Sequence, residues 1–268
     1  MNMKKIFSKV KDFLKKKKDE ASNRHDSLYI AKNNKQAKEL GVDPKIVCLT
    51  DHNSHVAEQY RLLRTNIQSQ FKDKPLKTIL ITSALRGEGK TTTSANVASL
   101  FARHYEGKRV LLVDCDLRRP AVHSLFGLEH TPGLSEMIRD GLDYKEVVKE
   151  KLKDRLYILP SGKYIENPGE LFDSSTFLEV LRKLKDNFDL IIFDAPPIIP
   201  VSDAGILAPY SDATLMVVKA RVTQSSDIIK ARDLLIEFRA KLVGVVLVCV
   251  ENYIPFYLQR YSYMYKYV

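Results

Sequence analysis

The feature that most constrains the fold is a buried apolar run that leads directly into a glycine-containing turn and then into a helical stretch. Residues 77–83 (KTILITS) are rich in β-branched side chains and are typical of a buried strand. The turn at residues 84–91 (ALRGEGKT) matches G-x-x-x-x-G-K-[S/T] except for Ala84 in the first glycine position. A helix is expected from Lys90. Because the motif follows a strand and precedes a helix, it is a phosphate-binding loop rather than an ordinary connection.

The residue types of this loop suit the binding of ATP and Mg²⁺. Backbone N–H groups of a tight glycine turn, at the positive end of a helix, form a cradle for phosphate oxygens. Lys90 can reach the terminal phosphates as a point charge, and the Thr91 hydroxyl can ligate Mg²⁺, which prefers hard oxygen ligands. The predicted nucleotide-binding residues are Arg86, Gly87, Glu88, Gly89, Lys90, Thr91 and Thr92.

Strands and helices alternate along the rest of the chain. After a helical pattern at residues 55–71, further strands are expected at residues 109–113, 156–159, 190–193, 214–218 and 242–248. Helical stretches lie between them at residues 135–149, 175–187 and 225–238. This order predicts an α/β protein with the P-loop NTPase fold, in which helices cover both faces of a mostly parallel sheet.

Two of these strands end in aspartates. Residues 110–113 lead into Asp114, Asp116 and Arg118, and residues 190–193 lead into Asp194, Ala195 and two prolines. Each aspartate by itself could be a turn former or a helix N-cap. Ligands of open parallel sheets bind at the carboxyl ends of the strands, so we expect all three carboxylates near the phosphates. Thr91, Asp116 and Asp194 are the predicted magnesium residues.

The net charge of +10 is concentrated at one end of the chain. Residues 1–50 hold 13 Lys and Arg against 6 Asp and Glu, a net charge of +7, which disfavours a uniformly basic surface for nucleic acid. Residues 1–20 have the pattern of a basic amphipathic helix, and residues 21–50 that of a polar linker. The helix could be a solvated tail, could contact an anionic membrane surface, or could dock on a membrane partner.

Cysteines and hydropathy favour a cytoplasmic protein. The three cysteines lack the paired spacings of a zinc site or a disulfide framework. No apolar run approaches the roughly 20 residues that span a bilayer, and lysines interrupt the N-terminus too often for a secretory signal.

The combination of motifs resembles the bacterial tyrosine kinases of capsule and exopolysaccharide systems, the cytoplasmic subunits of polysaccharide co-polymerases. The resemblance runs from about Glu58 to the C-terminus. It rests on the loop at residues 84–91, the Asp-x-Asp-x-Arg of residues 114–118 and the Asp-x-x-Pro of residues 194–197. Arg86, where this family often has Pro, and Val248, where it often has Asn, depart from the pattern. The resemblance implies a kinase domain over residues 51–250, preceded by the basic extension of residues 1–50.

Two further features take on a function through this resemblance. Glu58, Arg61 and Arg64 match a Glu-x-x-Arg-x-x-Arg motif that mediates ring-like self-association in the family, although at helical spacing they could also form a solvated charged face. Six of the 13 tyrosines fall in the last 16 residues. Residues 251–268 resemble the family's flexible autophosphorylation tail, although an aromatic terminus could simply pack on the domain or a partner. The tail tyrosines are Tyr253, Tyr257, Tyr261, Tyr263, Tyr265 and Tyr267.

The resemblance also implies a mechanism and partners. Lys90, Asp114, Asp116 and Arg118 are the expected catalytic residues, with one of the two aspartates accepting the tyrosine proton and the other acting on magnesium. The implied partners are further copies of the chain, a separate transmembrane activator and a phosphotyrosine phosphatase, at the inner face of the cell membrane.

Two other classes of protein remain as alternatives. A partition-type or division-site ATPase uses ATP to dimerise and has no tyrosine substrate, but it usually carries a signature Lys where this chain has Leu85. An adaptor that binds ATP only to regulate assembly would also contain the loop.

Overall fold

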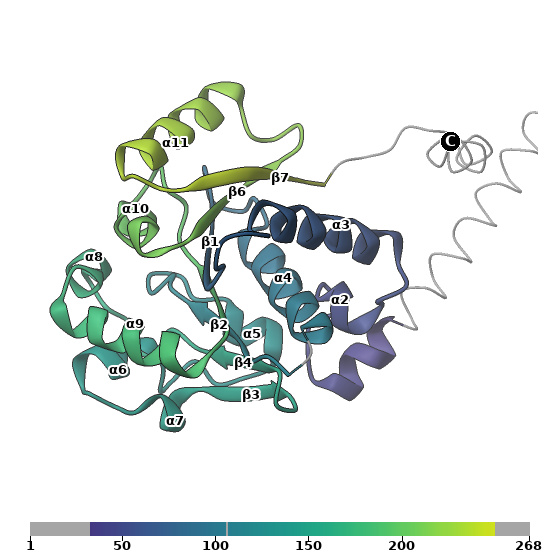
Figure 1. Cartoon of the computed structure of the whole chain (residues 1–268), viewed down its shortest axis with the longest axis horizontal. Helices are drawn as coiled ribbons and strands as arrows, with labels where there is room; N and C mark the ends of the chain where they lie inside the picture. The colour runs from purple at the N-terminus through teal and green to yellow at the C-terminus, as the bar shows by residue number, and fades with distance from the viewer. Residues whose placement is uncertain (1–32, 106, 250–268) are drawn as a thin grey trace, which may run out of the picture.

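The fold is a seven-stranded sheet between two layers of helices (Figure 1). The computed structural model describes residues 33–105 and 107–249. The strand order is β3-β4-β2-β5-β1-β6-β7, and every neighbouring pair is parallel except β3 and β4. The strands are β1 (Thr78–Ser83), β2 (Val110–Asp114), β3 (Lys149–Leu152), β4 (Leu156–Leu159), β5 (Leu190–Asp194), β6 (Ala213–Lys219) and β7 (Leu242–Val248). The predicted mostly parallel α/β fold is confirmed.

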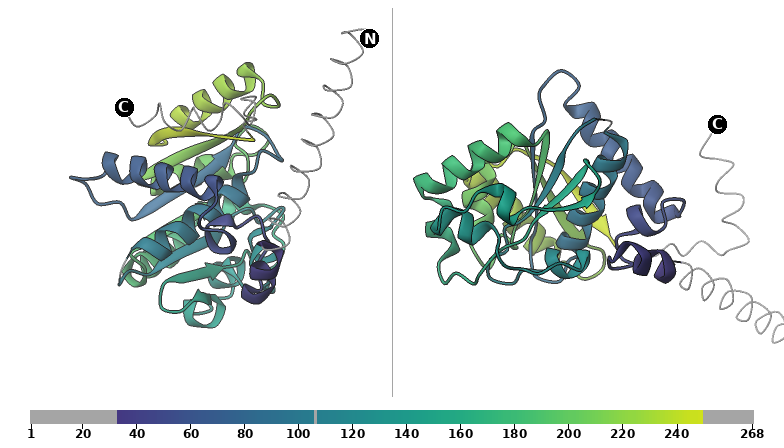
Figure 2. Two further views of the ribbon diagram at one scale, coloured as in Figure 1. Left: turned by 90° about the vertical axis from the view of Figure 1, so that its right-hand side faces the viewer. Right: turned by 90° about the horizontal axis from the view of Figure 1, so that it is seen from below.

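The two helical layers bury separate apolar clusters against the two faces of the sheet. On one face, residues such as Ile67, Ala98 and Phe126 pack from α2 (Val47–Thr50), α3 (His55–Gln70), α4 (Lys90–His104) and α5 (Val122–Phe126). On the other face, the cluster is completed by α6 (Leu134–Arg139), α7 (Tyr144–Val147), α8 (Pro168–Phe172), α9 (Ser175–Asn187), α10 (Asp203–Leu207) and α11 (Ser225–Glu237). Figure 2 shows the sheet between these layers, seen from below in its right-hand view.

The central strands β2, β5 and β1 are buried along their whole length, and their sequences are therefore mainly apolar without alternation. Their parallel register brings their carboxyl ends to one edge. Asp114 at the end of β2 pairs with Asp194 at the end of β5, and Ile81 of β1 lies opposite Asp194 from the other side. This edge of the sheet therefore carries the loop of residues 84–91 and the aspartates at the ends of β2 and β5.

The single helix predicted over residues 135–149 is wrong. The chain forms α6 and α7 instead, then turns into the short edge strand β3, which pairs antiparallel with β4. Gly141, with φ of 72°, and the Asp143 cap of α7 separate the two helices. The residues of β3, KEKL, are mostly charged, and an edge strand needs no apolar pattern because only one of its sides is paired.

The polar linker predicted at residues 21–50 is also wrong for the part that the structure describes. Residues 33–40 are helical, α2 follows, and Ile46 and Leu49 are buried in the same cluster as α4. Asn96 of α4 holds this segment through hydrogen bonds to Cys48 N and Lys45 O. A short apolar stretch next to Pro44 lacks enough periodicity to reveal this packing in the sequence. The basic helix of residues 1–20 and the tyrosine-rich tail lie outside the described residues.

No helix of the described residues combines the length and apolarity that a bilayer crossing requires.

Candidate active site

The loop between β1 and α4 has the backbone of a phosphate cradle. Gly87 and Gly89 have φ values of 77° and 87°, a conformation that is unfavourable for residues with a Cβ atom. Gly89 is the N-cap of α4. Among the described residues, no hydrogen bond is donated by the N–H groups of Gly87, Glu88 or Gly89. These consecutive donors at the positive end of a 15-residue helix form a site for an anion.

Lys90 joins this loop to the aspartates. Its Nζ lies 3.0 Å from Asp116 Oδ2, 3.5 Å from Asp194 Oδ2 and 3.3 Å from the Thr91 hydroxyl. Burial by itself lowers the pKa of the Lys90 ammonium, but the carboxylates of Asp194, Asp116 and Asp114 outweigh it, so the pKa is raised above its ordinary value. Lys90 is therefore a permanent positive charge at the mouth of the cradle.

Asp194 and Asp114 are fully buried carboxylates on neighbouring strands. Burial, and then repulsion from Asp194, raise the pKa of Asp114 to about 8, although Lys90 opposes them. Burial likewise raises the pKa of Asp194, against the attraction of Lys90. The Ser94 hydroxyl, one turn along α4 from Lys90, donates a 3.0 Å hydrogen bond to Asp194 Oδ1. Buried carboxylates that raise one another's pKa beside a lysine are typical of functional sites.

Asp114 and Asp116 have different surroundings. Asp114 accepts three backbone hydrogen bonds, from the N–H of Asp116 to Oδ1 and from those of Ala121 and Val122 to Oδ2, so both of its oxygens are occupied by its own loop. Asp116 accepts one, from Arg119 N to Oδ1, and turns Oδ2 to Lys90. Only Asp116 of the pair directs an oxygen toward the phosphate loop.

Arg118 does not face the aspartates of its own motif. Its Nε donates to Asp203 Oδ2 at 2.9 Å, and its Nη1 donates to the carbonyl of Glu166 at 3.3 Å. The hydrogen bond to Asp203 is the main reason that the pKa of Arg118 is raised. Asp203 is buried in α10, and neither Asp203 nor Ser94 was predicted from the sequence as a site residue. The motifs themselves do not indicate either residue, since only the fold brings α10 beside the loop that follows β2.

Glu88 was predicted among the nucleotide-binding residues, but its side chain points away from the cradle. It is buried, its Oε2 accepts a 2.9 Å hydrogen bond from Leu85 N, and its Oε1 accepts one from the Thr223 hydroxyl. Of the other predicted loop residues, Arg86 is exposed and Thr92 is half-buried in the first turn of α4. Glu88 can therefore contribute its backbone N–H to a ligand but not its carboxylate.

The predicted magnesium residues converge on one point. Thr91 Oγ1, Asp116 Oδ2 and Asp194 Oδ2 all lie within 3.5 Å of the Lys90 ammonium, so they surround a position that already attracts a cation. Hydroxyl and carboxylate oxygens are the ligands that Mg²⁺ prefers. Within residues 33–105 and 107–249, no three His, Cys, Asp or Glu side chains form a metal cage by themselves. The donor set fits a magnesium ion that takes its other ligands from phosphates and water.

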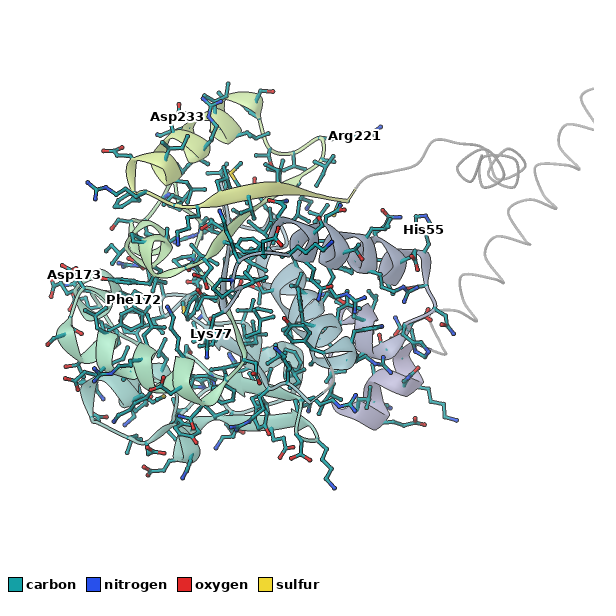
Figure 3. The ribbon with its side chains drawn as sticks, viewed as in Figure 1. His55, Lys77, Phe172, Asp173, Arg221 and Asp233 are labelled. Atoms are coloured by element: carbon teal, nitrogen blue, oxygen red, sulfur yellow. The ribbon has the colours of Figure 1, made fainter. Side chains whose placement is uncertain are left out.

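The predicted self-association residues lie on α3, on the helical layer outside the site. Arg61 Nε donates a 2.6 Å hydrogen bond to Glu58 Oε2, and its Nη1 donates to the carbonyl of His52. Arg64 Nε is buried and has no hydrogen-bond partner among the described residues. Figure 3 labels His55 at the start of this helix. The structure does not bring these residues to the phosphate loop.

The fold and this cluster of loop, lysine and aspartates define a P-loop nucleotide-binding protein. A family model described as an AAA domain matches residues 76–237. The tyrosine-protein kinase YwqD of Bacillus subtilis is 38% identical over 202 residues, covering 75% of this chain and 84% of the relative. The tyrosine-protein kinase CpsD of Streptococcus pneumoniae serotype 4 is 37% identical over 191 residues, covering 71% and 82%. The chain belongs to the family of bacterial tyrosine-protein kinases.

A solved structure, the chimerical protein CapA2B2, has the same fold. It superimposes with a TM-score of 0.72 and 29% identity, and the match covers 80% of this chain and 97% of the other.

Proposed function

We propose that the chain is an ATP- and Mg²⁺-dependent protein-tyrosine kinase that phosphorylates its own C-terminal tyrosines in trans and thereby regulates capsule or exopolysaccharide synthesis. The observation that carries the proposal is the convergence of Lys90, Asp116 and Asp194 beside three free loop N–H groups. The names of the relatives support the tyrosine-kinase activity. The six tyrosines of residues 253–267 support the choice of substrate.

In this proposal Lys90 and the loop N–H groups bind and orient the terminal phosphates, and they stabilise the charge that develops during transfer. A bound Mg²⁺ would neutralise phosphate charge and would be held through Thr91 and Asp194, so that Asp116, also predicted from the sequence as a magnesium residue, can act on the tyrosine instead. Lys90 must then exchange its contacts with Asp116 and Asp194 for contacts with phosphate oxygens.

The two aspartates of the Asp-x-Asp-x-Arg motif take different roles. A tyrosine hydroxyl with a pKa near ~10 needs a carboxylate to accept its proton. Asp116 is the candidate because its Oδ2 faces the loop, whereas three backbone N–H groups occupy Asp114. Asp114 and the Arg118–Asp203 pair hold the turn after β2 in place.

Partners and location follow from the same proposal. Glu58, Arg61 and Arg64 form a contact of a ring-like homo-oligomer, which delivers the tail of one subunit to the site of the next. The kinase works at the inner face of the cell membrane with a separate transmembrane activator, and a phosphotyrosine phosphatase reverses the reaction. The basic residues 1–20 contact anionic lipid or that activator.

The test is autophosphorylation of the full chain with labelled ATP and Mg²⁺, followed by mapping of phosphotyrosine. Label on residues 253–267 that is lost in Lys90→Met supports the proposal. ATP hydrolysis without phosphotyrosine identifies a division-site-type ATPase, and nucleotide binding without either reaction identifies an adaptor. Mixing Lys90→Met chains that carry the tail with wild-type chains that lack it tests transfer in trans.

A second test concerns assembly. Six phosphotyrosines add about −9 to −12 charges, which opposes packing of the tails on neighbouring subunits. We expect the oligomer mass to fall after treatment with ATP. A ring that keeps its mass with fully phosphorylated tails would contradict this regulatory step while leaving the kinase activity intact.

A further inference from the structure

The buried carboxylate of Glu88 is an unexplained feature of the phosphate loop. The side chain is only 2% exposed and lies within a loop whose proposed ligand is strongly anionic. A negative charge there opposes phosphate binding, and burying it is costly unless it is well hydrogen-bonded. Its presence therefore requires a compensating contact.

Two hydrogen bonds provide that compensation. Glu88 Oε2 accepts from Leu85 N at 2.9 Å, which closes the first half of the loop on itself, and Ser83 Oγ braces the same half by donating to the carbonyl of Leu85. Glu88 Oε1 accepts from the hydroxyl of Thr223, in the turn between β6 and α11. The carboxylate thus joins two segments that are 135 residues apart.

The turn that holds Thr223 is itself well defined. Thr223 Oγ1 accepts a 3.0 Å hydrogen bond from Lys219 N, and Thr223 N donates to the carbonyl of Lys219. Ala220 N donates to the carbonyl of Val248 at the end of β7. The turn includes Arg221, labelled in Figure 3, whose φ of 63° is unusual for a residue other than glycine. The turn that Glu88 contacts is therefore held by these three hydrogen bonds, although Arg221 and Val222 within it are exposed.

We propose that Glu88 is a positioning residue, and that its contact with Thr223 holds the phosphate loop in its binding conformation before the nucleotide arrives. Glu88 accepts from Leu85 N, whereas the N–H groups of residues 87–89 have no acceptor within the described part of the chain and can bind phosphate oxygens. Preorganised donors bind more tightly because less conformational entropy is lost on binding. The inference rests on the proposed nucleotide site and adds to it a residue that acts without touching the ligand.

The test compares Thr223→Val with Thr223→Ser in the full chain. We measure the dissociation constant for ATP with Mg²⁺ by calorimetry, using variants whose folding is checked by circular dichroism. Valine removes the hydroxyl at nearly constant volume, so we expect affinity to fall about tenfold, whereas serine keeps the hydroxyl and stays within about twofold of wild type. The KM for ATP in autophosphorylation should rise by the same factor as the dissociation constant.

Thr214→Val is the matched control. Thr214 lies in β6, the strand that precedes the Thr223 turn, and its buried hydroxyl has no hydrogen-bond partner among the described residues, so the same substitution there should leave ATP affinity unchanged. Equal ATP affinity in Thr223→Val and Thr214→Val would overturn the proposal, even if Thr223→Val lowered the melting temperature. A wild-type chain that binds no ATP would instead refute the proposed function.

A double-mutant cycle keeps the test decisive if a single variant folds poorly. Glu88→Ala loses both hydrogen bonds, so we expect it to weaken ATP binding at least as much as Thr223→Val does. If the two residues act through their contact, Thr223→Val has no further effect in the Glu88→Ala background. Effects on affinity that multiply in the double variant would contradict the proposed contact.

Discussion

Two ion-paired regions of the molecule differ in how far their side chains are exposed to solvent. At the carboxyl edge of the sheet, Lys90 and Asp116 approach to 3.0 Å with side chains only 12% and 9% exposed. On α3, Arg61 and Glu58 are as close, but their side chains are 29% and 51% exposed. Removing one partner of a buried pair leaves an uncompensated charge, whereas an exposed pair contributes about 0–1 kcal/mol. The buried charges of the site are therefore best explained by a function in catalysis. The exposed pair on α3 contributes too little stability for stability to explain its presence.

The largest effect is expected at Lys90. Lys90→Met removes the cation between Asp116 and Asp194, so three carboxylates remain together without a counter-charge and phosphates lose their lysine contact. We expect autophosphorylation to fall at least 100-fold, a loss of about 2.7 kcal/mol in transition-state stabilisation. Phosphotyrosine formation measures it. Lys45→Met, at a lysine whose side chain is 70% exposed, is the control and should retain full activity.

Asp194→Asn separates activity from stability. The amide removes a charge that repels Asp114, so we expect the free energy of unfolding to stay within about 1 kcal/mol of wild type or to rise. We expect kinase activity to fall by about 100-fold because a magnesium and lysine contact is lost. Urea unfolding and phosphotyrosine formation are the two measurements. A variant that is strongly destabilised yet active would show that Asp194 serves stability instead of catalysis.

Asp203→Asn gives an intermediate effect. The change weakens a charged hydrogen bond between buried Asp203 and half-buried Arg118, which should lower the free energy of unfolding by about 1–2 kcal/mol. Since Arg118 follows Asp116 closely, activity should fall as well. The comparison is Asp140→Asn in the exposed Arg139–Asp140 pair, where unfolding should change by less than about 0.5 kcal/mol. Equal losses of stability in the two variants would argue against a special role for Asp203.

The smallest effect on stability is expected on α3. Glu58→Ala should change the free energy of unfolding by less than about 0.5 kcal/mol, yet reduce the oligomer mass measured by light scattering. Asp233→Ala, in the exposed Arg232–Asp233 pair of α11, is the matched control and should alter neither quantity. An unchanged mass for Glu58→Ala would leave the pair as a solvated charged face.

The sequence predicted the central fold well and the periphery less well. The strands of the sheet centre are unbroken apolar runs between turn residues, a pattern that burial on both faces imposes. The prediction of one helix over residues 135–149 was wrong because a helical pattern does not reveal a break at a glycine followed by a charged edge strand. The prediction of a polar linker was wrong for residues 33–50 because a few apolar side chains, such as Ile46 and Leu49, are buried without forming a periodic pattern in the sequence.

The site divides in the same way. The loop, Lys90, Asp114, Asp116 and Asp194 can be predicted from the sequence because each lies at the end of a strand or in the turn that follows it, and parallel strands end at one edge. The spacing within each motif is enough to identify those residues, since the backbone geometry and the charge of a phosphate site allow few residue types. Only the tertiary structure decided that Glu88 turns to Thr223, that Arg118 turns to Asp203, and that Asp116 rather than Asp114 faces the loop. These choices depend on which distant segment supplies a hydrogen-bond partner, and that information is not local to any motif.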